Sequence, residues 1–209
     1  MYGIKEIYYT IQGEGYHTGQ AAVFLRFSGC NLWSGLEKDR SSAQCTFCDT
    51  DFWGTDGMNG GKYTAKDLAS FCKSLWPATN NTQPYIVCTG GEPLLQLDEE
   101  LINTLKEEGF FIAIESNGTI SVPKGIDWIC ISPKLQSQLL VTSGHELKLV
   151  YPQDGIDLDV YEKMNFKFLS LQPLDDEHQT AHTKTCIDIC KTRPRWRLSL
   201  QTHKYTGIP

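Results

Sequence analysis

The chain has 209 residues, of which 40% are hydrophobic and 21% charged, and its formal net charge is −6. This balance is typical of a globular protein, and the negative charge argues against broad binding to nucleic acids or to an anionic membrane surface. No apolar run reaches the roughly 18 residues of a membrane span, and residues 1–10 do not resemble a secretory signal. We therefore expect a cytoplasmic protein whose eight cysteines are mostly reduced, so clustered cysteines favour metal binding or catalysis.

Short apolar segments alternate with helix-like segments along the chain. We expect strands at 22–27, 85–88, 111–115, 128–131, 146–150, 168–171 and 196–200, and helices at 64–75, 98–108, 158–164 and 182–191. This order predicts an α/β fold with a largely parallel sheet. A complete eight-fold barrel needs about 250 residues. We therefore expect a single domain, 1–209, shaped as an incomplete (β/α) barrel with an insertion at about 31–44.

Three cysteines stand close together in the sequence. Cys45 and Cys48 form a CxxC pair, and Cys30 directly follows a predicted strand. Three thiolates can hold a [4Fe–4S] cluster and leave one iron open, whereas a structural zinc site or an electron-transfer cluster requires a fourth ligand. Cys72 and Cys88 lack ligand-pair spacing. A redox dithiol remains an alternative for the CxxC pair taken alone.

A second motif, TGGEP at 89–93, follows the predicted strand 85–88. Its two glycines would allow the backbone to approach a ligand closely. Glu92 would supply an acceptor for the ammonium group of a bound amino acid. A simple strand-to-helix turn is the alternative interpretation.

With the three cysteines, this motif resembles the radical S-adenosylmethionine (SAM) superfamily. That superfamily usually has three residues between the first two cysteines, whereas this chain has fourteen. Within the superfamily, the chain resembles the 7-carboxy-7-deazaguanine synthase family, in its variant with an enlarged cluster-binding loop. The segments that carry the resemblance are YTIQGEG at 9–15, FLRFSGCNLW at 24–33, CTFCDTD at 45–51, ESNG at 115–118, ISPK at 131–134 and QTHKY at 201–205.

The resemblance implies both a fold and a reaction. The fold would be a modified, incomplete barrel of the radical SAM type, and the protein a homodimeric lyase. The reaction would be the ring contraction of 6-carboxy-5,6,7,8-tetrahydropterin to 7-carboxy-7-deazaguanine with release of ammonia, a step towards queuosine and other 7-deazapurines. It implies a [4Fe–4S] cluster, SAM, Mg²⁺ and an electron donor such as flavodoxin.

The resemblance also implies a substrate site. Glu14 would accept the parallel donors of the pterin as a face-on carboxylate, and Arg26, within an apolar strand, would pair with the substrate carboxylate. Without the resemblance, Glu14 would be interpreted as an exposed residue of a hairpin turn, Arg26 as a solvent-facing residue of an edge strand, and His203 as an exposed residue of the tail. Pro209 would contribute the C-terminal carboxylate of a tail that closes the site. The residues expected to contact the substrate are Ile11, Gln12, Gly13, Glu14, Arg26, Thr89, His203 and Pro209.

Cofactor contacts are expected beside the cysteines and after later strands, where ligands bind in such folds. Thr50 would bind Mg²⁺ through its hydroxyl group; a turn cap is the alternative. The residues expected to contact SAM are Phe47, Asp49, Gly91, Glu92, Asn117, Ser132, Lys134 and Gln172.

Rival interpretations remain for the whole chain. Another radical SAM reaction, such as activation of a glycyl-radical enzyme, would share the cysteines and TGGEP but not Glu14 or the His203 tail. A non-catalytic zinc-binding module and a flavin- or thiol-based redox protein are further alternatives. His178, His182, Cys186 and Cys190 recur every four residues, but helical geometry prevents all four from surrounding one ion, so a partly buried helix face is expected there.

Overall fold

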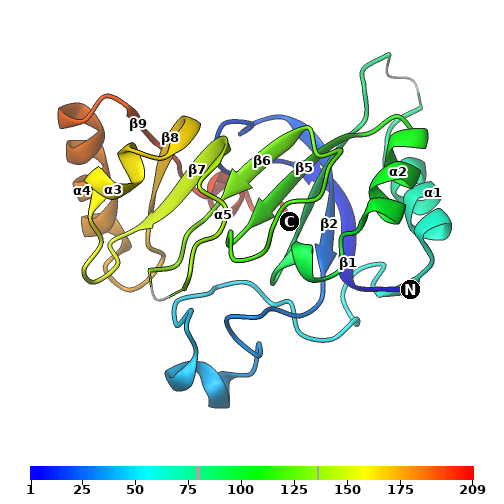
Figure 1. Ribbon diagram of the computed structural model, residues 1–209, viewed down its shortest axis with the longest axis horizontal. Helices are drawn as coiled ribbons and strands as arrows, with labels where there is room; N and C mark the ends of the chain where they lie inside the picture. The colour runs from blue at the N-terminus through cyan, green and yellow to red at the C-terminus, as the bar shows by residue number, and fades with distance from the viewer. Residues whose placement is uncertain (79–80, 136) are drawn as a thin grey trace.

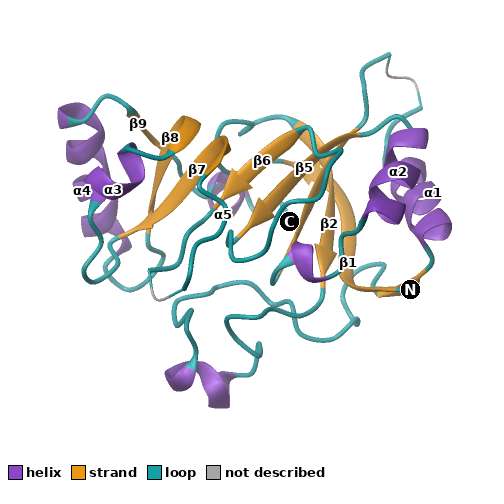
Figure 2. Ribbon diagram, viewed as in Figure 1, coloured by secondary structure: helices purple, strands orange, loops and turns teal. Residues whose placement is uncertain are grey.

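A nine-stranded sheet forms the centre of the protein in the computed structural model, which describes residues 1–78, 81–135 and 137–209 (Figure 1). The strands are β1 (Tyr2–Ile11), β2 (Ala21–Phe27), β3 (Gly61–Tyr63), β4 (Tyr85–Gly90), β5 (Phe111–Ser116), β6 (Trp128–Ile131), β7 (Ser143–Tyr151), β8 (Asn165–Pro173) and β9 (Trp196–Leu198). The helices are η1 (Glu37–Ser42), α1 (Ala65–Leu75), η2 (Pro93–Leu95), α2 (Glu99–Glu107), α3 (Leu158–Glu162), α4 (Gln179–Thr192) and α5 (Thr202–Thr206). Figure 2 shows how helices, strands and loops are distributed.

The sheet has the order β3-β1-β2-β4-β5-β6-β7-β8-β9. Its neighbours from β2 to β9 are parallel, whereas β1 pairs antiparallel with β2 and β3. The two edge strands, β3 and β9, are not paired with each other, so the sheet stays open. This confirms the predicted α/β fold with a largely parallel, incomplete barrel.

All seven predicted strands and four predicted helices are present, with ends that differ by up to three residues. The sequence did not predict β1, β3, η1, η2 or α5. In β1, the charged residues Lys5 and Glu6 interrupt the apolar pattern, and pairing with β2 fixes the extended conformation. Two connections, from β5 to β6 and from β6 to β7, contain no helix among their described residues.

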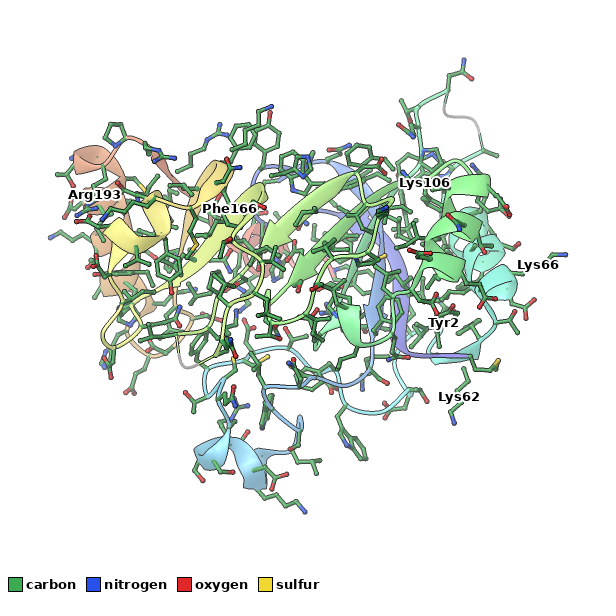
Figure 3. The ribbon with its side chains drawn as sticks, in the orientation of Figure 1. Tyr2, Lys62, Lys66, Lys106, Phe166 and Arg193 are labelled. Carbon is green, nitrogen blue, oxygen red and sulfur yellow. The ribbon has the colours of Figure 1, made fainter. Side chains whose placement is uncertain are left out.

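Helices cover one face of the sheet and bury its apolar side chains. Val23, Leu25, Ile86 and Ile112 pack with α1 and α2, while α3 and α4 cover β7, β8 and β9. Phe166 of β8 belongs to this second part of the core (Figure 3). Thr64 caps α1 by accepting a hydrogen bond from the Asp67 amide, and such a cap stabilises a helix by about 1 kcal/mol.

The opposite face changes character along each strand. Near the amino ends it is apolar, with Tyr85, Ala113 and Trp128 in a third cluster. Near the carboxyl ends the same alternation presents polar residues: Arg26 on β2, Glu115 on β5, Lys148 on β7 and Gln172 on β8. Because carboxyl ends of parallel strands meet at one edge, these side chains converge. The arrowheads of β2, β5 and β6 point towards the side where the loop with η1 lies (Figure 1).

Candidate active site

Two adjoining cavities lie at the carboxyl edge of the sheet. The cluster-side cavity is lined by Cys30, Cys45, Cys48 and the ends of β4 to β8. The tail-side cavity is lined by β1, β2 and the C-terminal tail. The residues that line both are Glu14, Asp49, Thr50, Thr89, Glu115 and Gln201. The two cavities therefore share a wall.

The three cysteine thiols of the sequence motif line the cluster-side cavity together. The thiol of Cys45 donates a hydrogen bond to Cys48, which lowers the pKa of Cys48 to about 6 and, with burial, raises the pKa of Cys45. Burial also raises the pKa of Cys30, whose sulfur accepts a hydrogen bond from the Leu32 amide at 3.4 Å. The five other cysteines do not line this cavity. A set of three thiols in one cavity fits a [4Fe–4S] cluster with one open iron.

A single-ion site is not formed by these cysteines. Within the described part of the chain, no three His, Cys, Asp or Glu side chains converge closely enough to hold one metal ion. A four-iron cluster requires no such convergence, because each thiolate binds a different iron.

The two glycines of TGGEP allow β4 to pack against the cysteine segment. A Cβ atom on Gly91 would lie 2.3 Å from the Gly29 carbonyl oxygen and 2.7 Å from the Cys30 Cβ. The Glu92 amide donates to the same Gly29 carbonyl at 3.0 Å. Any side chain at position 91 would push Cys30 away from its present place.

Glu92 is buried behind the cavity and does not line it. Its carboxylate accepts hydrogen bonds from the Leu94 amide at 3.0 Å, the Ser116 hydroxyl at 2.9 Å and the Asn117 amide at 2.8 Å. Burial raises its pKa. In this structure Glu92 joins the end of β4 to the end of β5, so the expected contact with an ammonium group would need a rearrangement of these hydrogen bonds.

The other residues expected to contact SAM line the cluster-side cavity. The ammonium of Lys134 lies 2.7 Å from the Ser132 hydroxyl and 5.7 Å from the centre of the Phe47 ring. The side-chain amide of Asn117 donates to Asn31 at 3.0 Å. Further around the wall are Asp49, Gly91 and Gln172. The cavity thus offers a cation, amides and an aromatic face beside the thiols.

All eight residues expected to contact the substrate line the tail-side cavity. Arg26 has partners within the chain: its Nε donates to Glu6 Oε1 at 2.7 Å and its Nη2 to the Tyr8 hydroxyl at 3.1 Å. The Gly13 carbonyl accepts the Thr202 amide at 2.9 Å and the Thr202 hydroxyl at 2.8 Å. Arg26 therefore retains its charge beside the cavity, but the Gly13 carbonyl is already occupied by the tail.

Lys148 lies between two carboxylates at the wall shared by both cavities. Its Nζ donates to Glu14 Oε2 at 2.5 Å and to Glu115 Oε2 at 2.6 Å, while the Gln12 amide donates to Glu115 Oε1 at 2.9 Å. Burial acts to lower the pKa of Lys148, but Glu115 and Glu14 outweigh it and raise the pKa well above the ordinary value. The group holds two negative charges and one positive charge, an arrangement that suits hydrogen-bond donors on a ligand.

Neither Glu115 nor Lys148 was predicted from the sequence as a site residue. Glu115 ends the apolar run 111–115, and Lys148 lies between two leucines in 146–150, where Glu146 is also charged. The same signal pointed to Arg26, because a charge in a buried strand requires a partner. It applied equally to these two residues.

The C-terminal tail closes one side of the tail-side cavity. A Cβ atom on Gly13 would lie 2.5 Å from His203 Nδ1, so the glycine makes room for this histidine. The Thr10 hydroxyl donates to the main-chain oxygen of Pro209 at 3.2 Å. His203 and Pro209 are thereby held at the wall of the cavity that Arg26 also lines.

Known proteins provide an independent comparison. A 7-carboxy-7-deazaguanine synthase from Burkholderia multivorans is 54% identical over 209 residues, covering 100% of this chain and 99% of that protein. One from Caulobacter vibrioides is 53% identical with the same coverage. The chain belongs to the 7-carboxy-7-deazaguanine synthase family. The crystal structure of QueE from Escherichia coli matches with a TM-score of 0.72, at 28% identity over 97% of this chain and 94% of that one. No family model matches the sequence.

Membership of the 7-carboxy-7-deazaguanine synthase family confirms the predicted resemblance. It also rules out the zinc-module and thiol-redox interpretations of the cysteines. None of the helices in residues 1–78, 81–135 and 137–209 is both long and apolar enough to cross a membrane.

Proposed function

We propose that this chain contracts the ring of 6-carboxy-5,6,7,8-tetrahydropterin to give 7-carboxy-7-deazaguanine and ammonia. The observation that best supports this proposal is that three thiols line one cavity, while Glu14 and Glu115 line the wall that it shares with the adjoining cavity. Cys30, Cys45 and Cys48 would hold the [4Fe–4S] cluster. When bound, the cluster and SAM together supply the radical that begins the reaction, and the protein orients the partners and excludes water.

SAM would bind in the cluster-side cavity. Lys134 supplies a cation for its carboxylate, and the face of the Phe47 ring lies beside that cation. Asp49, Gly91, Asn117, Ser132 and Gln172 surround the remaining space. For Glu92 we propose that it supports the SAM site by fixing the Asn117 backbone amide, which lies 2.8 Å from Glu92 Oε2.

The pterin would bind in the tail-side cavity. The 2-amino group and the adjacent ring N–H of the pterin would donate to Glu14. Arg26, which already pairs with Glu6, would also pair with the carboxylate of the pterin. Ile11, Gln12, Gly13, Thr89, His203 and Pro209 would shape the rest of the site. Lys148 keeps Glu14 ionised: burial acts to raise the pKa of Glu14, but Lys148 outweighs burial and lowers it.

Mg²⁺ is proposed at the wall shared by both cavities. Thr50 lies there, between the cysteine loop and the tail-side cavity. Its hydroxyl oxygen is a ligand type that Mg²⁺ accepts, with substrate oxygens and waters completing the shell.

We also propose a cytoplasmic homodimer that receives electrons from a donor such as flavodoxin. Tyr9 and Ile11 of β1 are exposed apolar side chains, and they support a partner surface at this edge of the sheet. Light scattering on the purified protein would measure the oligomeric state.

An anaerobic assay tests the proposed function. The reconstituted protein is incubated with SAM, Mg²⁺, a reductant and 6-carboxy-tetrahydropterin, and 7-carboxy-7-deazaguanine is measured by mass spectrometry. Cys45→Ala should lose both the iron–sulfur absorbance and the product. Cys190→Ala, on the far helix α4, is the matched control and should keep both. Product formation by Cys45→Ala, or none by the unmodified chain, would contradict the proposal.

A further inference from the structure

The CxxC loop is held in place by very few backbone contacts. Residues 45–52 belong to no helix or strand. No backbone–backbone hydrogen bond joins residues 46–51 to any other described residue. A loop of this kind has no intrinsic reason to present Cys45 and Cys48 in one arrangement, because its polar groups could bond to water in many conformations.

The side chains of Asp49 and Asp51 pair with Lys204 and Lys5, but the backbone of the loop is bonded by a side chain from the insertion. Nη1 of Arg40, in η1, donates to the Thr46 carbonyl at 2.9 Å and to the Cys48 carbonyl at 3.1 Å. These two carbonyls flank the central part of the CxxC turn. A single guanidinium group therefore fixes the backbone on both sides of Phe47.

Arg40 is itself fixed by neighbours within the same insertion. Its Nε donates to both carboxylate oxygens of Glu37, at 2.8 and 2.9 Å. The guanidinium lies 4.0 Å from the centre of the Trp33 ring. Trp33 is 8% exposed and packs edge-on against Phe52, with ring centres 5.4 Å apart. The contacts form a continuous chain from the core, through Trp33 and Arg40, to the cysteine loop.

We propose that Arg40 is a positioning residue for the cluster, and that this is what the long spacing between Cys30 and Cys45 provides. The fourteen intervening residues turn back through η1, so that a guanidinium reaches the loop it helps to order. In the usual superfamily motif only three residues separate the first two cysteines, so that segment would have no residue available at the position of Arg40. The inference rests on the proposed function, because it assumes that Cys45 and Cys48 bind the cluster.

Lysine cannot replace arginine in this arrangement. The planar guanidinium binds two carbonyls and one carboxylate while it stacks on an indole ring, whereas an ammonium is a point charge without a flat face. Outer contacts of this kind change metal affinity by about 10–100-fold when they are lost. We therefore expect a large effect on cluster retention even from Arg40→Lys.

The test compares iron retention in the reconstituted full-length protein. Arg40→Met and Arg40→Lys are measured with Lys38→Met, which removes an exposed lysine from the same insertion. Iron release to a chelator is followed anaerobically, and the electron paramagnetic resonance spectrum of the reduced cluster is recorded with and without SAM. Both Arg40 variants should release iron about tenfold faster than the unmodified chain, with broadened spectra, while Lys38→Met should not change.

Two outcomes separate this inference from the proposed function. If Cys45→Ala holds no cluster but Arg40→Met and Arg40→Lys release iron at the rate of Lys38→Met, the role of Arg40 is refuted and the cysteine assignment stands. If Cys45→Ala retains a full cluster, the assignment itself fails. Should Arg40→Met not fold, Arg40→Lys, which keeps the charge and most of the side-chain volume, decides the matter alone.

Discussion

Lys204 Nζ, in the C-terminal helix α5, lies 2.6 Å from Oδ2 of Asp49, the residue that follows Cys48. Lys204 also contacts Asp175, after β8, and the Gln201 amide donates to the same Asp49 oxygen at 3.1 Å. Burial acts to raise the pKa of Asp49, but these hydrogen bonds outweigh it and lower the pKa. The tail and the cysteine loop are thereby joined across the mouth of the site.

Lys204→Met should weaken catalysis more than stability. The ion pair is partly exposed, so its loss should reduce the free energy of unfolding by less than about 1 kcal/mol. The tail that carries His203 would move, and kcat/KM for the pterin should fall by about tenfold. Steady-state kinetics and urea unfolding measure the two effects. Lys184→Met, on the exposed side of α4, is the control; equal kinetics in both variants would count against the link.

Lys148→Met should destabilise the fold, because the carboxylates of Glu14 and Glu115, whose side chains are 16% and 22% exposed, would lose their buried cation. Breaking a buried pair in this way costs about 3–5 kcal/mol. Adding Glu115→Gln to Lys148→Met should recover part of the loss, since one uncompensated charge is removed. Chemical unfolding of both variants measures the difference, and a loss below about 1 kcal/mol for Lys148→Met would show that the group is solvated.

The pH dependence of stability should contain a contribution from Glu14. Lys148 holds the pKa of Glu14 below its ordinary value of about 4.3, against the effect of burial. The folded state therefore binds this proton less tightly than the unfolded state. The stabilisation is complete above the ordinary pKa and is lost as the pH falls through the folded pKa.

The measurement is the free energy of unfolding of the unmodified chain and of Glu14→Gln between about pH 6 and pH 3. The difference between them should shrink as the pH falls. Glu107→Gln, at an exposed position on α2, should differ from the unmodified chain by a small amount at every pH. A Glu14→Gln difference that grows towards low pH would contradict a lowered pKa of Glu14 in the folded state.

Gly91→Ala should prevent normal cluster assembly while leaving most of the fold intact. The added Cβ would lie 2.3 Å from a backbone oxygen, that of Gly29, and backbone atoms cannot rotate aside as a side chain can. Cys30 would shift with Gly29. Iron and sulfide content after reconstitution is the measurement. Gly109→Ala, at φ +86° with open space around it, should cost about 1 kcal/mol of stability and keep a full cluster.

Sequence patterns predicted the helix-covered part of the sheet well. Apolar runs such as 85–88 and 112–114 are buried on both faces, so their hydrophobicity alone indicates strands. The η1 helix carried no such signal, because none of its residues is buried. Its conformation is tied to contacts made by Arg40 with Trp33 and with the cysteine loop, which no local pattern reports.

The sequence by itself determined the chemistry of the site: three cysteines, two adjacent glycines and a tail with His203 are recognisable in order and spacing. Tertiary structure decided which groups meet. Lys148 and Glu14 are far apart in the chain but 2.5 Å apart in the fold, and Glu92 faces the end of β5 rather than the cavity. The physical reason is that residue type and spacing fix what each group can bind, whereas the direction of a side chain depends on the sheet register and on the loops that cover it.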